Sequence, residues 1–288
     1  MKKIFLILLL LFGISGCAKL NTDPSISSDE ETPFVASEKQ LVAHFLDVGQ
    51  ADANVIELPN GELMLIDAGL SGSSEEIIQY IQDLGYDEID YVVATHPHAD
   101  HIGGMAEVID AFKIGNIYMP RAVSTSKTYE NLLEVIQDKG LTIKTGKIGV
   151  KVLEEEELSI EMFAPVGDDY SNLNNYSIVL KITYGDVSFL YTGDAEEENL
   201  EEITGDIEAD VLKVGHHGSD TSTSKDFLEK VQPEYAIISV GEGNSYGHPA
   251  SSTIELLKEY TNHIYLTNEN GTVVVSTDGV NIDVETER

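Results

Sequence analysis

The sequence predicts an α/β protein in which two packed β-sheets are covered by outer helices. Short runs that are apolar or alternate between apolar and polar residues recur along the chain from about residue 41 onward, as β-strands do. Between many of these runs, apolar residues repeat with the 3.6-residue period of an α-helix. No second linker and no internal repeat divides this part of the chain, so we expect one domain with its helices packed outside the sheets.

Taken in order, the predicted elements begin with three strands and continue as alternating helices and strands, with a meander of strands alone in the middle. Strands are expected near residues 42–48, 53–58, 62–67, 89–95, 115–119, 141–144, 148–153, 157–163, 176–184, 186–192, 209–215, 235–240, 263–267, 271–276 and 280–284. Helices are expected near residues 74–84, 101–112, 127–138, 195–203, 223–231 and 251–261. Ser224 and Ser252 are expected N-caps, and Gly85 and Gly140 are expected helix ends.

The N-terminus has the pattern of an export signal. Two lysines precede the apolar run 4–12, which is too short to span a bilayer comfortably. Residues 14–17, Ile-Ser-Gly-Cys, resemble the lipobox of bacterial lipoproteins. That resemblance implies a signal peptide over residues 1–17, lipid on Cys17, and a protein held at the extracytoplasmic face of the cell membrane. The alternative is an uncleaved anchor. Residues 18–40 are polar and acidic and are expected to form a flexible tether.

Charge and cysteine content limit the possible functions. The chain has 17 basic and 51 acidic residues, a formal net charge of −34. A surface of this kind repels polyanions, and it lacks the basic patch that nucleic-acid binding usually needs. Metal ions could supply local positive charge, so a nuclease is disfavoured but not excluded. Cys17 is the only cysteine, which leaves the folded part without a disulfide or a thiolate metal ligand.

The most informative segment is His96-x-His98-x-Asp100-His101, which directly follows the predicted strand at residues 89–95. Two imidazoles that are two residues apart on extended backbone point the same way and can hold one metal ion. The following Asp-His pair turns into a predicted helix and can hold a second ion about 3.5–4 Å from the first. This spacing of two ions is typical of metal-assisted hydrolysis.

Further polar side chains follow other predicted strands. Asp67 and Asp194 each stand in a glycine-containing turn at a strand end, and His216 and His217 follow another strand within Gly-His-His-Gly-Ser. His248 precedes the last predicted helix. Side chains on loops at strand ends are held in place by a rigid sheet and commonly perform catalysis.

Together these segments resemble the metallo-β-lactamase-fold hydrolases. Within them, the chain is most similar to the branch that contains the nuclease domain of ComEC-type competence proteins and the phosphorylcholine esterases of the cell surface. The stretch 45–53 matches the start of that branch, with Ala51 where glycine is usual. The resemblance covers residues 41–276. It implies an αββα four-layer sandwich, and we expect a hydrolase domain over residues 41–288.

The resemblance also implies two divalent metal ions, zinc or manganese, with assigned ligands. His96 and His98 would hold the first ion, Asp100, His101 and His216 the second, and Asp194 would bridge both. Because neighbours on a strand face opposite sides, we expect only one of His216 and His217 to be a ligand. We choose His216, and we expect His217 to bind substrate or transfer a proton.

Asp67 and His248 complete the predicted site. Asp67 is expected to orient a ligand histidine through its other ring nitrogen. His248 could donate to a phosphoryl oxygen or protonate the leaving group. Many relatives supply a third histidine to the first ion between the main motif and the bridging aspartate, but no histidine lies between His101 and Asp194 here. The first site is therefore expected to be weaker and more open to manganese.

The expected function is that of a membrane-tethered, extracytoplasmic, metal-dependent hydrolase. We expect a two-metal phosphodiesterase or nuclease that attacks phosphorus with a metal-bound hydroxide. Its substrate would be nucleic acid or a phosphodiester polymer of the cell envelope, and the sequence does not decide between them. The alternatives are a hydrolase of a non-phosphate ester or lactam, and a binding lipoprotein without catalysis. A true β-lactamase is disfavoured because Asp194 stands where that resemblance would require a cysteine.

Overall fold

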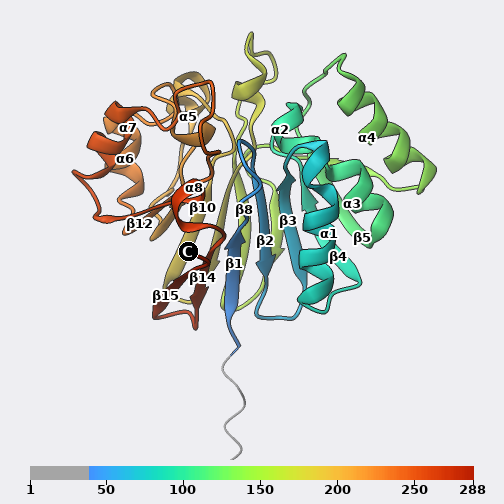
Figure 1. The fold of residues 1–288 in the computed structure, drawn as a ribbon, viewed down its shortest axis with the longest axis horizontal. Helices are drawn as coiled ribbons and strands as arrows, with labels where there is room; N and C mark the ends of the chain where they lie inside the picture. The colour runs from blue at the N-terminus through green and yellow to red at the C-terminus, as the bar shows by residue number, and fades with distance from the viewer. Residues whose placement is uncertain (1–38) are drawn as a thin grey trace, which may run out of the picture. The chain divides into compact units, whose positions relative to one another are not determined.

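The computed structural model describes residues 39–288, which form two packed β-sheets with helices on both outer sides (Figure 1). The α/β class and the αββα layering predicted from the sequence are confirmed. The predicted signal peptide, Cys17 and all but the last two residues of the predicted tether lie outside the described residues. Within the described part, no helix is long and apolar enough to cross a membrane.

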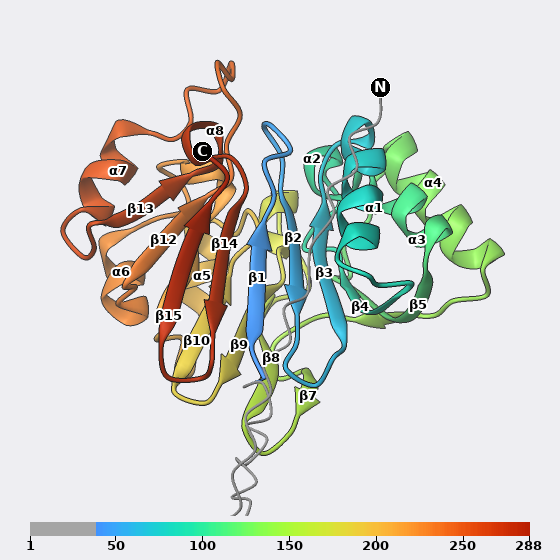
Figure 2. The same ribbon diagram turned by 60° about the horizontal axis from the view of Figure 1, so that its bottom comes forward.

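The first sheet has eight strands in the order β15-β14-β1-β2-β3-β4-β5-β6. Its strands are β1 (Leu41–Phe45), β2 (Ala53–Glu57), β3 (Leu63–Ala68), β4 (Glu88–Val93), β5 (Lys113–Met119), β6 (Ile143–Thr145), β14 (Val273–Thr277) and β15 (Ile282–Thr286). Strands β3 to β6 run parallel to one another, whereas β15, β14, β1, β2 and β3 pair antiparallel. The antiparallel pairing of β14 with β1 places a late segment beside the first strand (Figure 2).

The second sheet has seven strands in the order β13-β12-β11-β10-β9-β8-β7. Its strands are β7 (Lys151–Glu154), β8 (Leu158–Ala164), β9 (Val179–Tyr184), β10 (Val187–Tyr191), β11 (Val211–Lys213), β12 (Tyr235–Ile238) and β13 (His263–Leu266). The predicted meander corresponds to β7 to β10, which pair antiparallel, and the strands from β10 to β13 are parallel.

Three apolar clusters hold these layers together. The central cluster lies between the sheets and includes Phe45, whose ring stacks on Tyr191 with centroids 5.8 Å apart. A second cluster packs the first sheet against α1 (Ser74–Asp83), α3 (Met105–Ala111) and α4 (Lys127–Asp138). A third packs the other sheet against α5 (Glu197–Glu202), α6 (Lys225–Val231) and α7 (Ser251–Leu257). Burial of these apolar faces is the main favourable term in folding.

Some helix boundaries differ from the predictions. The single helix expected over 101–112 is wrong, because the chain instead forms α2 (Ala99–Ile102) and α3, with Gly103 and Gly104 between them. Ser224 does cap α6, since its side chain accepts a hydrogen bond from the backbone of Phe227. Ser252 is not an N-cap, because α7 begins at Ser251. The short helix α8 (Thr267–Asn270) was not predicted.

Candidate metal centre

The His-x-His-x-Asp-His segment turns sharply after β4 because two glycines let it pack closely against the backbone. A Cβ atom on Gly103 would lie 2.6 Å from the backbone nitrogen of Ser71, and one on Gly104 would lie 2.5 Å from the carbonyl oxygen of Ala68. Only glycine therefore fits at both positions. This close contact fixes α2, and α2 carries Asp100 and His101.

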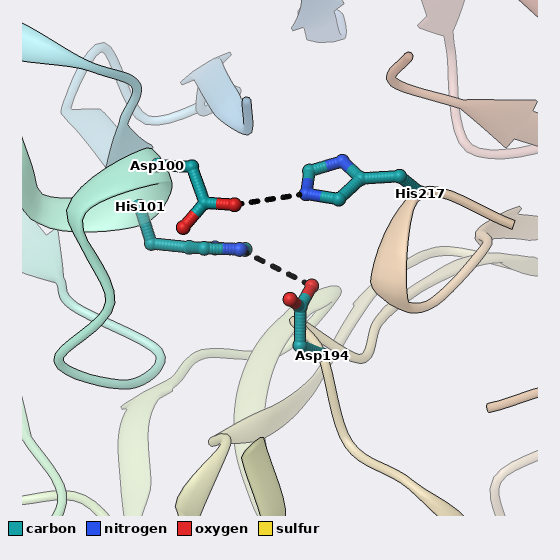
Figure 3. Close-up of side chains that lie close together, drawn as sticks. All are labelled: Asp100, His101, Asp194 and His217. Carbon is teal, nitrogen blue, oxygen red and sulfur yellow. Dashed lines mark ion pairs between the residues drawn. The ribbon is translucent and has the colours of Figure 1, made fainter. Parts of the chain in front are cut away.

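Four side chains from distant parts of the sequence meet at the carboxyl ends of the parallel strands. The group consists of Asp100, His101, Asp194 and His217, whose candidate ligand atoms all lie within 4.8 Å of one another. Figure 3 shows Asp100 and His101 facing Asp194 and His217 across a small space. Nε2 of His101 is 3.1 Å from Oδ1 of Asp194, and Nε2 of His217 is 3.5 Å from Oδ2 of Asp100.

Asp67 orients His101 within this group. Nδ1 of His101 donates a hydrogen bond of 2.7 Å to Oδ2 of Asp67, which leaves Nε2 directed toward Asp194. Asp67 is itself fixed, because both its carboxylate oxygens accept hydrogen bonds from Thr95, one from the backbone and one from the hydroxyl. A carboxylate behind a histidine in this way sets the ring orientation of metal ligands. The geometry is the one expected for Asp67 from the sequence.

The electrostatics of the buried group favour a cation. Burial alone would lower the pKa of His101, but the carboxylates of Asp194 and Asp67 raise it well above its usual value. Burial likewise opposes ionisation of Asp194, yet the charges of His101 and His217 hold the pKa of this carboxyl well below its usual range. A buried carboxylate whose pKa is held low, as that of Asp194 is, stabilises positive charge beside it, whether it is an imidazolium or a metal ion.

His216 and His217 lie in a tight turn and not on a strand. Both have left-handed backbone angles, with φ of 48° for His216 and 52° for His217. The rule that strand neighbours face opposite sides therefore does not apply to them, and both imidazoles line the same cavity. His217 is 2% exposed, and its Nδ1 donates a hydrogen bond of 2.9 Å to the carbonyl oxygen of Ser239.

The placement of these two histidines differs from the sequence prediction. His216 was expected beside Asp100 and His101, but the structure brings His217 into that group instead. His216 lies on the other side of the bridging carboxylate, with its Nε2 3.8 Å from Oδ2 of Asp194. His217, expected to contact substrate or transfer a proton, is almost fully buried.

His96 and His98 also lie on the Oδ2 side of Asp194. Nε2 of His96 is 3.8 Å from Oδ2 of Asp194 and 3.0 Å from Nδ1 of His98. Burial lowers the pKa of His96 well below its usual value and also lowers the pKa of His98. Both rings therefore favour the neutral form, which is the form that binds a metal ion.

The residues present fit the divalent ions expected from the sequence. His101 Nε2, His217 Nε2 and Asp194 Oδ1 are buried, and apart from the facing atoms of the group itself they have no hydrogen-bond partner among the described residues. A buried polar atom without a partner is costly, and an ion between these atoms would remove that cost. Bonds of about 2.0–2.1 Å in a tetrahedral zinc site place neighbouring ligand atoms roughly 3.3 Å apart. The spacings of 3.0 to 3.8 Å on the two sides of Asp194 match this requirement.

A cavity of about 310 Å³ opens onto the site. Its lining includes the ligand candidates His98, Asp100, Asp194, His216 and His217, together with Gln50, Asn174, Tyr246 and His248. Tyr246 is 71% exposed, and its ring lies nearly parallel to that of His248, with centroids 5.9 Å apart and an interplanar angle of 11°. His248 is therefore placed where a bound substrate could reach it.

Several further residues support the site. Lys213 is 1% exposed, and its Nζ donates a hydrogen bond of 2.8 Å to Asp52. Ser177 accepts a hydrogen bond from the backbone of Asp194, and Asn175 accepts one from the backbone of Glu196. These groups fix the turn that carries the bridging aspartate. A lysine or asparagine near a strand end gives no sequence signal for such a role.

The family model described as "Metallo-beta-lactamase superfamily" matches residues 46–242, more than half of the chain. The chain belongs to this superfamily. The family resemblance stated from the motifs is therefore confirmed. Membership of this superfamily indicates a metal-dependent hydrolase and implies divalent metal ions. The buried group of candidate ligands agrees with that assignment.

Two curated relatives show which branch of the superfamily the chain is similar to. ComE operon protein 3 of Bacillus subtilis (strain 168) is 32% identical over 84% of this chain and 33% of its own length. Recombination protein 2 of Haemophilus influenzae is 31% identical over 80% of this chain and 28% of its own length. The predicted similarity to competence proteins of the ComEC type is thus confirmed. The chain spans only about a third of the length of these relatives.

A solved structure supports the fold. The metallo-beta-lactamase fold protein YhfI from Bacillus subtilis superposes with a TM-score of 0.53 at 12% identity, over 83% of this chain and all of that one. At this level of identity the likeness concerns the fold alone.

Proposed function

We propose that this protein is a two-metal phosphodiesterase. The observation that carries the proposal is the position of Asp194, whose two carboxylate oxygens face different sets of imidazoles. Oδ1 faces His101, and Oδ2 faces His96 and His216. A carboxylate can span two ions in this way, and paired ions are suited to displacement at phosphorus.

The chain offers ligands for one ion on each side of Asp194. Asp100, His101 and His217 stand on the Oδ1 side, and His96 and His98 stand on the Oδ2 side. When bound, zinc or manganese ions supply a water of lowered pKa and neutralise charge on a phosphoryl group. In this proposal His217 is a metal ligand, whereas the sequence predicted that it binds substrate or transfers a proton.

Other groups of the protein orient the ligand histidines and are placed to bind the substrate. Asp67 holds the proton on Nδ1 of His101, so that Nε2 is the nitrogen left for an ion. Ser239 does the same for His217 through its backbone carbonyl. His248 lies on the open side of the cavity, where its imidazole can hydrogen-bond a phosphoryl or leaving-group oxygen.

The proposed substrate is a phosphodiester of nucleic acid or of the cell envelope. The names of the relatives, a ComE operon protein and a recombination protein, favour nucleic acid. The net charge of −34 disfavours tight binding of a long polyanion, because the chain has few basic residues to offset phosphate charge. A short or single-stranded phosphodiester as the substrate is compatible both with the names of the relatives and with the negative charge of the chain.

Hydrolysis of bis(p-nitrophenyl) phosphate tests the activity. The protein loaded with manganese or zinc is expected to release p-nitrophenol, and Asp194→Ala is expected to lower the rate at least about 1,000-fold, since both ions lose a ligand. No turnover with either metal, despite two bound ions, would refute the phosphodiesterase and bring carboxylic esters and lactams forward. Single-stranded DNA and a poly(glycerol phosphate) then distinguish the two substrate classes.

We also propose that lipid on Cys17 tethers the protein to the extracytoplasmic face of the membrane. The support is the Ile-Ser-Gly-Cys segment after a short apolar run. Growth with a labelled fatty acid should label the wild-type protein and leave Cys17→Ser unlabelled. Equal labelling of both proteins would contradict the proposal.

A further inference from the structure

Glu196 lies beside Nδ1 of His216, as Asp67 lies beside Nδ1 of His101, although at a longer distance. Oε1 of Glu196 is 3.4 Å from Nδ1 of His216, and Nε2 of the same ring is 3.8 Å from Oδ2 of Asp194. On the other side of the site, Asp67 holds Nδ1 of His101 while Nε2 faces Oδ1 of Asp194. The bridging aspartate is thus flanked by two carboxylate–histidine pairs.

Glu196 is held in place by hydrogen bonds from three side chains. Its Oε2 accepts a hydrogen bond of 2.8 Å from the side chain of Asn172, and its Oε1 accepts one of 3.1 Å from Asn174. The hydroxyl of Thr221 also donates to Oε1, at 3.3 Å. A carboxylate fixed from three directions can hold the ring orientation of His216, as a carboxylate behind a metal ligand does.

His216 shares its face of Asp194 with the first two histidines of the motif. Nε2 of His96 and Nε2 of His216 each lie 3.8 Å from Oδ2 of Asp194. His217, in contrast, faces Asp100 on the Oδ1 side. Left-handed backbone at both positions of the turn lets two adjacent imidazoles serve different sides of one carboxylate.

We propose that His216, oriented by Glu196, is the third histidine of the ion held by His96 and His98. The sequence has no histidine between His101 and Asp194 to fill this position. The inference rests on the two-metal site of the proposed function, and it makes the two adjacent histidines ligands of different ions. It also makes Glu196 a positioning residue that acts through His216.

Metal titration tests the assignment without relying on catalysis. Mn²⁺ and Zn²⁺ are titrated separately by calorimetry into the metal-free full-length protein, with Mn²⁺ occupancy followed by electron paramagnetic resonance. Wild type should bind two ions. Glu196→Gln should weaken one of them about 10- to 100-fold and leave the other unchanged. Glu198→Gln is the matched control, because its carboxylate accepts a hydrogen bond from Asn175 and contacts no histidine in the described structure.

Histidine variants decide whether the two rings serve one ion or two. His216→Ala and His217→Ala should each weaken one ion, and the double variant should bind neither tightly. If both rings serve the same ion, the double variant keeps one ion at wild-type affinity, and the proposal fails. His216 is partly exposed, so His216→Ala carries the test if Glu196→Gln does not fold.

Other outcomes separate this inference from the proposed activity. Two ions in wild type, one of them weakened in both His216→Ala and Glu196→Gln, support the inference even if bis(p-nitrophenyl) phosphate is not hydrolysed. Unchanged binding of both ions by His216→Ala overturns it even if the protein is an active phosphodiesterase. Fewer than two ions in wild type also overturns it.

Discussion

The histidines on the two sides of Asp194 differ in how far they are closed to solvent. On the Oδ1 side, Asp100 is partly exposed, but His101 is 0% and His217 is 2% exposed, and each ring is fixed by a hydrogen bond behind it. On the Oδ2 side, His96 is also 0% exposed, but His98 and His216 are only partly buried and line the cavity together with His248. The molecule therefore combines a rigid inner half-site with an accessible outer half-site.

This difference predicts that the two half-sites bind their ions with different affinity. A buried, pre-oriented set of ligands loses little entropy when an ion binds, so the inner half-site should hold its ion more tightly. The outer half-site can exchange its ion and admit a phosphate group. The following variants test how far the two sides are independent.

The largest effect is expected from Lys213→Met, behind the inner half-site. The variant removes the ammonium group that pairs with the buried carboxylate of Asp52. This carboxylate lies 3.5 Å from Nδ1 of His217. Loss of one partner of a buried ion pair costs about 3–5 kcal/mol. Urea denaturation of the metal-free protein should show a loss of stability of this size.

The exposed pair Lys225–Glu229 provides the control for this experiment. Its atoms are 4.0 Å apart on the surface of α6, so Lys225→Met should change stability by less than about 1 kcal/mol. Adding Asp52→Asn to Lys213→Met should recover part of the loss, because the unpaired charge is removed. Equal costs for the two lysine variants would show that the buried pair does not support the inner half-site.

Asp67→Asn should have an intermediate effect that is confined to the inner half-site. The amide cannot accept from Thr95 and His101 as the carboxylate does, so the ring of His101 loses its fixed orientation. Affinity for one ion should fall about 10- to 100-fold in metal titrations. A matching loss at both ions would show that the two sides are not independent.

The smallest effect is expected from Tyr246→Ala at the open edge of the cavity. The exposed ring can stack on an aromatic group of the substrate, an interaction worth about 0.5–1.5 kcal/mol. KM for bis(p-nitrophenyl) phosphate should rise between about twofold and tenfold, with kcat unchanged. A fall in kcat with constant KM would instead place the ring in the chemical step.

The strands were predictable because burial of one or both sheet faces leaves a clear pattern in the sequence. Each predicted strand has a counterpart in the structure, including the short edge strand β6. The break between α2 and α3 was missed, because the apolar period continues through Gly103 and Gly104. What ends the helix is close contact with the backbone of residues 68–74, which no local pattern reveals.

For the site, the sequence predicted which residue types would lie close together. It did not predict on which side of Asp194 each of them lies. The motif brings His96 to His101 together by local geometry alone. The division of His216 and His217 between two sides of Asp194 depends on left-handed backbone, whereas the prediction assumed a strand. Glu196 and Asp52 were not recognised, because an acidic residue that contacts a histidine looks like any other in a chain with 51 acidic residues.

The pairing of β1 with β14 has a consequence for the order of folding. Phe45 pairs with Val273, so the first strand made during synthesis must wait for one of the last before its free edge is covered. Contacts between such distant segments slow folding, and an uncovered strand edge can pair with other chains. A nascent chain stalled before β14 should therefore be prone to aggregation and protease-sensitive, even with every metal ligand already synthesised.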